Sequence, residues 1–152
     1  MQKIYLDNAA TTPLNPEVIE VMCEQLRDNF GNPSSTHEYG RKARVLLEST
    51  RKQIATSFRC SPSQVLFTSG GSEADNLVLQ NAARHWGIKR FISSEIEHHA
   101  VLHALDAIKK DNDVAVEHVR INAFGEVDME HLEELLQNSA VPCMVSLMMV
   151  NN

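Results

Sequence analysis

The chain has 152 residues, enough for one domain that buries roughly 68–70% of the surface its unfolded form exposes. Its 43% hydrophobic and 22% charged residues are typical of a soluble globular protein, and a net charge of -6 argues against partners bound by bulk positive charge, such as nucleic acids or anionic membranes. No apolar run approaches the roughly 18–20 residues of a membrane span. Three separated cysteines, Cys23, Cys60 and Cys143, indicate a reducing compartment, so we expect a cytoplasmic protein.

Two helices are predicted in the first sixty residues, after a strand-like start at "KIYL". Pro16 suits the first turn of the first helix, whose apolar side comprises Val18, Ile19, Val21, Met22 and Leu26. The second is predicted from Thr36 to about Phe58, with an apolar face that includes Ala43, Leu46, Leu47, Ile54 and Ala55. We interpret its charged side as solvent-exposed (Arg41, Lys42, Arg44, Glu48 and Arg51), and residues 1–60 as an N-terminal arm against the following domain.

Strand and helix patterns alternate from Ser61 onward. Strands are predicted at 64–69, 90–94, 114–121 and 141–150, and helices at 72–86, 97–110 and 128–137. Short apolar strands separated by helices of this length imply βαβ units and a mainly parallel sheet, so residues 61–152 are predicted to be an α/β domain. The run at 141–150 is nearly continuous in apolar residues, which predicts a strand covered on both faces.

The sequence stops at Asn152, directly after that last strand. Open α/β sheets bind ligands at the carboxyl edge to which the strand leads. We therefore expect this chain to be the first part of a longer protein.

A glycine turn precedes the helix predicted at 72–86. Gly70 and Gly71 allow a positive φ or a close approach to a ligand, Ser72 can cap the helix, and Asp75 lies at the capping-box distance. Free N–H groups at a helix start form a ready anion site. The spacing matches neither GxxxxGK[ST] nor GxGxxG, so a small phosphate group is the ligand class that remains. The alternative is a capped turn with no ligand.

Three histidines cluster in the segment that follows the strand predicted at 90–94. His99 and His103 would share one helix face, with Glu95 four residues before His99. Without HExxH or a further ligand we predict no metal site. His98 lies off that face, near the strand's carboxyl end, where it could meet a ligand bound at the glycine turn.

Taken together, these segments resemble the cysteine desulfurases, NifS/IscS-like members of the class V branch of fold-type I pyridoxal-phosphate (PLP) enzymes. The matching segments follow family order and spacing across essentially the whole chain: "YLDNAATTP", "FGNPSSTH", "FTSGGSEADN", "IEHHAVL", "GEVDMEHLEELL" and "VNN". The resemblance implies the first part of the PLP-binding large domain, a mainly parallel sheet with flanking helices, preceded by the N-terminal arm.

The resemblance also implies the site residues. The amides of Gly71 and Ser72, with the Ser72 hydroxyl, would hold the PLP phosphate. His98 would stack on the pyridine ring and move protons, and Asn152 would contact the phenolic oxygen. Residues 8–12 would line the substrate side.

The implied activity is PLP-dependent removal of sulfur from L-cysteine, giving L-alanine and an enzyme persulfide for iron–sulfur cluster or thio-cofactor assembly. A homodimer and a sulfur-acceptor or scaffold protein are the implied partners. The family's Schiff-base lysine, attacking cysteine and carboxylate-binding arginine cannot be placed here, and we interpret the three cysteines as structural. We therefore expect this segment alone to be inactive. Alternatives are another class V enzyme (a selenocysteine lyase or an aminotransferase) and a non-catalytic fragment or binding domain.

Overall fold

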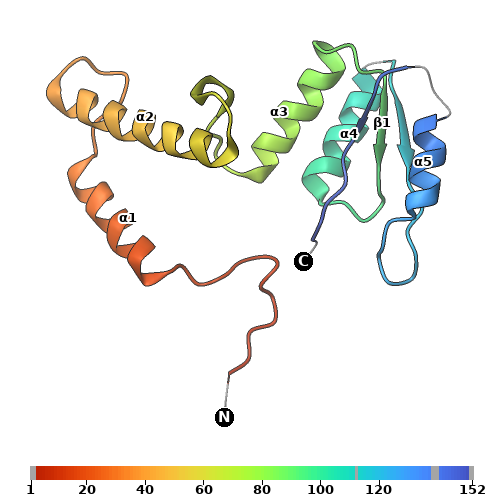
Figure 1. Cartoon of the computed structure of the whole chain (residues 1–152), viewed down its shortest axis with the longest axis horizontal. Helices are drawn as coiled ribbons and strands as arrows, with labels where there is room; N and C mark the ends of the chain where they lie inside the picture. The colour runs from red at the N-terminus through yellow and green to blue at the C-terminus, as the bar shows by residue number, and fades with distance from the viewer. Residues whose placement is uncertain (1–2, 112, 138–140, 151–152) are drawn as a thin grey trace. The chain divides into compact units, whose positions relative to one another are not determined.

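The computed structural model of the chain describes residues 3–111, 113–137 and 141–150 (Figure 1). They belong to two compact units: residues 11–67 form one, and residues 68–152 with residues 1–10 form the other. The predicted division into an arm at 1–60 and a domain at 61–152 remains a prediction. Within the described residues, no helix has the length and apolar character needed to cross a bilayer.

The unit containing residues 68–152 is built on a parallel sheet. Strands β1 (Arg90–Ser93), β2 (Ala115–His118) and β3 (Cys143–Val145) lie in the order β2-β1-β3, with β1 parallel to both neighbours. Helices α3 (Gly71–Arg84) and α4 (His99–Asp111) lie on one side of the sheet, and α5 (Met129–Gln137) lies on the other (Figure 1). The predicted α/β class with a parallel sheet and flanking helices is therefore confirmed.

The core of this unit is formed on both faces of β1, because successive residues of a strand point to opposite sides. Phe91 is 1% exposed and packs with residues of α3 and α4 and with the residue before β2: Leu79, Ala82, Ala83, Val101, Ala104, Leu105, Ile108 and Val114. Ile92 is fully buried and packs with Val119 and with Leu132 of α5. The sheet is thus held between two apolar layers.

Two of the predicted strands are absent. Residues 3–6 are irregular, and the strand predicted at 64–69 is replaced by a short 3-10 helix, η1 (Pro62–Gln64), and irregular residues. The Val65 carbonyl instead accepts a hydrogen bond from the Arg51 guanidinium, whose central carbon lies 4.7 Å from the centre of the Phe67 ring. Strand formation requires a partner strand for the backbone groups, and apolar patterning does not supply one.

The strands at the other predicted positions are shorter than expected. β2 ends at His118, and only an isolated antiparallel bridge joins Ile121 to Val127 beyond it. β3 spans Cys143–Val145. Met144 and Cys143 pack against opposite apolar layers, but both are only partly buried and Val145 is 39% exposed, so the predicted coverage on both faces is confirmed only in part. It lies at an edge of the described sheet, with β1 as its one neighbouring strand.

The unit of residues 11–67 contains the two predicted helices, α1 (Pro16–Asp28) and α2 (Glu38–Phe58). Pro16 opens α1, and the side chain of Asn15 caps it by accepting a hydrogen bond from the Glu17 N–H at 2.9 Å. None of the thirteen residues of α1 is buried, and the five on its apolar side are 45–76% exposed. The helix was predicted correctly, but its apolar side is uncovered within this unit.

The loop of residues 29–37 packs closely on the first turns of α2. Arg44 donates a hydrogen bond from Nε to the Pro33 carbonyl at 2.7 Å. A Cβ at Gly40 would lie 2.5 Å from the Ser35 carbonyl oxygen, so the close approach of loop and helix requires glycine there. The predicted solvent-exposed side of α2 is wrong for Arg51, whose side chain is only 20% exposed because it contacts Val65 and Phe67.

Candidate functional site

The carboxyl ends of the three strands meet at one edge of the sheet. The Ser146 N–H donates to the Ile92 carbonyl at 2.9 Å, and the Val119 N–H donates to the Ser93 carbonyl at 2.8 Å, so the pairing continues past the strand ends. α4 begins at this edge because it follows β1. α3 ends before β1 begins, so its first turn points toward the same edge. This is where open α/β sheets bind ligands.

The glycine turn forms the start of α3. Gly70 is the N-cap with φ 169° and ψ -179°, and Gly71 is the first helical residue. Of the two uses predicted for these glycines, a left-handed positive φ is absent, because Gly70 is fully extended and Gly71 is helical. The close approach to a ligand stays a prediction. Ser72 is not the cap, because the helix begins one residue earlier than predicted.

The amide groups of this turn are available to a ligand. In the part of the chain that the structure describes, the N–H groups of Gly71, Ser72 and Glu73 have no hydrogen-bond partner. A Cβ built on Gly70 or on Gly71 would meet nothing within 4 Å, so the space beside the turn is open. Unpaired N–H groups at the positive end of a helix dipole suit an anion such as a phosphate group.

The capping box predicted for Ser72 and Asp75 is absent; instead Glu73, at the third helical position, bonds back to Ser69, the residue before the N-cap. Its Oε2 accepts hydrogen bonds from the hydroxyl and the N–H of Ser69, both at 2.7 Å. The bond from the Ser69 hydroxyl has the larger effect and the bond from its N–H the smaller, and together they hold the pKa of the Glu73 carboxyl below its ordinary value. Placing the helix start at Gly71 puts an acid at the third helical position, which was the sequence signal for this cap.

A hollow of about 240 Å³ lies between the first half of α3 and the end of β3. It is lined by Ala74, Asp75, Val78, Leu79, Met144 and Ser146. Ala74 and Asp75 lie about one helical turn after the glycine turn, and Ser146 directly follows β3, so the hollow borders both segments. Asn152 itself lies outside the described residues, so its predicted role remains a prediction.

His98 immediately precedes α4 and caps it. Its Nδ1 accepts a hydrogen bond from the Ala100 N–H at 3.1 Å, and its carbonyl accepts from the N–H groups of Val101 and Leu102. Because Nδ1 is an acceptor, the neutral ring carries its proton on Nε2. The imidazole is exposed, so Nε2 is accessible at the carboxyl edge of the sheet.

The residue before His98 was missed by the sequence analysis. Glu97 is only 6% exposed, and its Oε1 accepts a hydrogen bond from the Met148 N–H at 2.6 Å. This bond ties the turn that carries His98 to the segment that follows β3. The sequence signal was weak, because an acid in a loop is usually solvent-exposed.

The predicted substrate-side residues, 8–12, are exposed. In this segment the Asn8 side chain donates a hydrogen bond from Nδ2 to the Tyr5 carbonyl at 3.3 Å. Their position relative to the glycine turn and His98 remains a prediction.

His99, His103 and Glu95 do not converge on one point. His99 stacks on His103 with ring centres 5.5 Å apart, whereas Glu95 lies 3.8 Å from Nδ1 of His118. Across the described ranges, no group of three or more His, Cys, Asp or Glu side chains is arranged to hold a metal ion.

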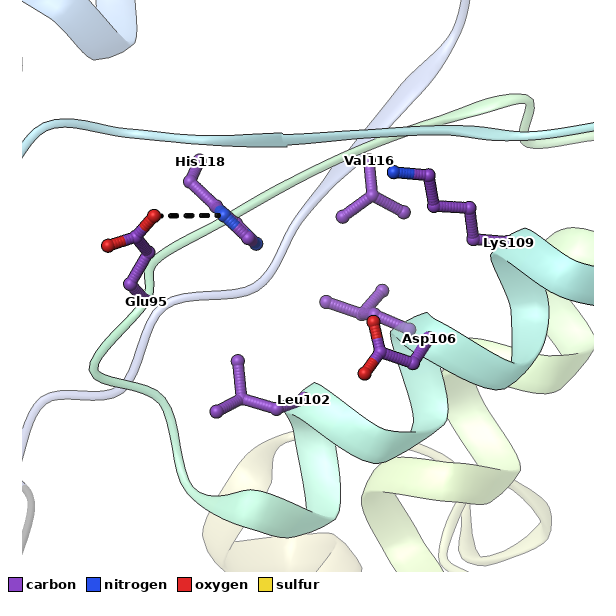
Figure 2. A pocket seen from close by; sticks show the side chains of 7 residues that line it. Glu95, Leu102, Asp106, Lys109, Val116 and His118 are labelled. Carbon is purple, nitrogen blue, oxygen red and sulfur yellow. Dashed lines mark ion pairs between the residues drawn. The ribbon is translucent and has the colours of Figure 1, made fainter.

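A second hollow, of about 250 Å³, lies between α4 and β2 (Figure 2). Glu95 and His118 face each other at one side of it, and Leu102 and Val116 contribute apolar walls (Figure 2). None of the predicted site residues lines this hollow. It is therefore distinct from the predicted cofactor site.

Comparison with known proteins identifies relatives across the chain. Residues 4–152 match the family model for aminotransferase class-V. A putative cysteine desulfurase IscS 1 of Bacillus subtilis (strain 168) is 36% identical over 155 residues, and the match covers 100% of this chain and 40% of the length of that protein. A selenocysteine lyase of Bos taurus is 32% identical over 171 residues, and the match covers 99% of this chain and 39% of the length of that protein.

The solved structures agree with the sequence relatives. A NifS-like protein superposes with a TM-score of 0.86 at 32% identity, over 99% of this chain and 41% of that one. DndA from Streptomyces lividans superposes with a TM-score of 0.77 at 33% identity, over 98% of this chain and 42% of that one. The chain thus spans about two fifths of the length of these relatives and matches their N-terminal portion. The chain belongs to the aminotransferase class-V family, as its resemblance to the NifS/IscS-like proteins predicted.

Proposed function

We propose that this chain is the N-terminal part of a PLP-dependent cysteine desulfurase, which converts L-cysteine to L-alanine and an enzyme persulfide. The observation that carries the proposal is the match, at about 36% identity over the whole chain, to proteins named cysteine desulfurase. The persulfide sulfur would pass to an acceptor or scaffold protein for iron–sulfur cluster or thio-cofactor assembly. We further propose a cytoplasmic homodimer.

The glycine turn fits the phosphate of PLP. Its support is the set of unpaired N–H groups at Gly71 and Ser72, the open space beside the glycines, and the Ser72 hydroxyl in the first helical turn. Glu73 does not obstruct these groups by hydrogen bonding to them, since its carboxylate is engaged by Ser69. A phosphate there would receive two amide hydrogen bonds and the favourable end of the α3 dipole.

His98 would serve as the proton-handling residue. Its Nδ1 is occupied by the Ala100 N–H, so a proton would be held or moved at Nε2. When bound, PLP supplies the electron sink that makes the substrate α-proton removable. Asn152 is proposed to contact the cofactor, and residues 8–12 to line the substrate side.

Catalysis also requires groups that this segment does not assign. None of the cysteines, Cys23, Cys60 and Cys143, is proposed as the attacking thiol. In the described residues Cys23 is exposed, and the other two are half-buried. We expect the 152-residue segment with added PLP to release no alanine from L-cysteine.

The direct test is turnover by a full-length protein that carries this segment. Purified with PLP and supplied with a thiol that reduces the enzyme persulfide, it should release alanine and sulfide from L-cysteine in equal amounts. His98→Gln, which cannot titrate, should lower kcat by about 10²- to 10⁴-fold. Alanine release by the isolated 152-residue segment, or no turnover of cysteine by the full-length protein, would contradict the proposal.

Because the chain is also similar to a selenocysteine lyase, substrates other than cysteine should be tested. Cysteine, selenocysteine and an amino acid–keto acid pair should be compared under identical conditions, with kcat/KM as the readout. A preference for selenocysteine or for transamination would assign another class V activity and leave the phosphate site unchanged.

Ser72→Ala tests the phosphate site by itself. We expect weaker PLP binding by roughly tenfold, because one hydrogen bond to a charged group is lost. Ser57→Ala is a matched control, since Ser57 lies on α2 and bonds to the Gln53 carbonyl. PLP titration by absorbance measures both variants, and equal affinities would reject the assignment of Ser72.

A further inference from the structure

A buried carboxylate lies between the two segments that lead to the proposed PLP site. Glu97 is 6% exposed, whereas Glu95, two residues earlier in the same turn, has a side chain that is 79% exposed. A buried carboxylate is costly unless it is paired or hydrogen-bonded. Its burial in a turn therefore requires a specific compensating interaction.

A backbone N–H group compensates for the burial of the Glu97 carboxylate. Glu97 Oε1 accepts the Met148 N–H at 2.6 Å, across 51 residues of sequence. Among the described residues, no Lys, Arg or His lies within ion-pair distance of Glu97. Its position just before α4 also places the negative charge near the positive end of that helix.

The geometry of the two joined segments indicates what the bond does. On one side, the turn continues into His98, which is fixed by its own hydrogen bond from the Ala100 N–H. On the other side, Met148 follows Ser146, whose N–H extends the β1–β3 pairing to Ile92. Beyond Met148 the chain leaves the sheet, and Met149 is 98% exposed, so no apolar packing holds the next residue.

We propose that Glu97 is a positioning residue that fixes the His98 turn relative to the segment leading from β3 to Asn152. This inference rests on the proposed function for its catalytic meaning, because His98 and Asn152 are the two residues expected to contact the cofactor ring. Glu97 itself acts through backbone geometry. Its role requires a hydrogen-bond acceptor at this position, and an amide oxygen can fulfil it.

The test compares Glu97→Gln with Glu97→Ala, and uses Glu95→Ala as the matched control from the same turn. The readouts are amide hydrogen exchange at Met148 and the ¹⁵N chemical shifts of the His98 ring, which report the tautomer. Glu97→Ala should accelerate exchange at Met148 by about tenfold or more and mix the His98 tautomers. Glu97→Gln should retain slow exchange and the Nε2-protonated ring, as should Glu95→Ala.

A merely structural role predicts a different pattern. If Glu97→Ala only lowered the stability of the fold, hydrogen exchange would accelerate at the core amides of Phe91 and Leu105 as well as at Met148. If Glu97 is a positioning residue, those core amides stay protected. Uniform acceleration, or unchanged exchange at Met148 in Glu97→Ala, would overturn the proposal. If Glu97→Ala does not fold, a loosened Met148 amide in Glu97→Gln with an intact core would also contradict it.

PLP titration in the same samples separates this proposal from the proposed function. If the unmodified full-length protein binds no PLP, the proposed function fails while the exchange data still decide the role of Glu97. If it binds PLP, Glu97→Ala should alter the visible absorption band of the bound cofactor and Glu97→Gln should not. An unaltered band in Glu97→Ala would reject positioning of the ring contacts.

Discussion

In the unit that contains residues 68–152, β1 presents Phe91 and Ile92 to apolar layers on both faces, and both side chains are almost fully buried. In the unit of residues 11–67, the five apolar residues on one side of α1 remain 45–76% exposed. The helix α1 with its apolar side and the strand β1 were both predicted from the pattern of apolar residues in the sequence. The difference shows that periodicity identifies an apolar side but not the surface that covers it, so the two sets should contribute very differently to the stability of this chain.

Truncation of one apolar residue in each unit gives the largest expected contrast. Phe91→Ala should lower the free energy of unfolding by about 3–5 kcal/mol, because it leaves a cavity in the core. Leu26→Ala should change it by about 0.5 kcal/mol or less, because Leu26 is 76% exposed. Urea denaturation followed by circular dichroism measures both.

Equal losses in these two variants would contradict the comparison and indicate that α1 is covered in solution. Should Phe91→Ala prevent folding, Ile92→Val provides a milder core change. It removes one methyl group from a fully buried side chain, with an expected loss of about 0.5–1.5 kcal/mol.

Replacing one glycine in each unit by alanine should change the stability of the chain in opposite directions. Gly40→Ala places a Cβ 2.5 Å from the Ser35 carbonyl oxygen and should destabilise the chain by about 1–3 kcal/mol. Gly71→Ala meets nothing within 4 Å at the first position of α3 and should stabilise it by about 0.4–1 kcal/mol. Thermal denaturation should therefore move Tm down for the first variant and up for the second. A rise in Tm for Gly40→Ala would show that the loop of residues 29–37 does not pack on α2 as described.

The sequence predicted those parts of the fold that depend on local pattern. Helices at Pro16–Asp28, Glu38–Phe58 and Met129–Gln137 follow from caps and apolar periodicity, and β1 from a short apolar run between helices. The strand predicted at 64–69 failed because pairing is a property of two segments, and no described strand pairs with this one. The shorter β3 has the same cause, since it has one neighbour within the described sheet.

The candidate site was predicted in outline but not in its supporting contacts. The glycine turn and His98 were identified by their residue types and by their place after or before a predicted element. Glu73 was missed because the N-cap is Gly70 and not Ser72, which moves the third helical position from Asp75 to Glu73. Glu97 was missed because its partner, Met148, is 51 residues away, and no local pattern encodes such a contact.

The smallest expected effect concerns the cap at the start of α3, and it depends on pH. The hydrogen bonds from Ser69 hold the folded-state pKa of Glu73 below its ordinary value of 4.5, so they favour the charged carboxylate. Their contribution to stability is therefore fully present above that ordinary value and is lost as the pH falls through the lower, folded-state pKa. Glu73→Gln removes this pH-dependent contribution. The stability difference between the unmodified chain and the variant should be largest near neutral pH and should shrink below about pH 4.5.

Urea denaturation at a series of pH values between neutrality and acid measures this difference. Ser69→Ala is the graded comparison, because it deletes the hydroxyl donor but retains the Ser69 N–H, which also bonds to Glu73. Its stability difference from the unmodified chain should also shrink on acidification, but the difference should be smaller than that of Glu73→Gln. A difference that grows on acidification would mean that the protonated form of Glu73 is the one the fold favours. The hydrogen bonds from Ser69, which favour the charged carboxylate, would then not be the interactions that stabilise the start of α3.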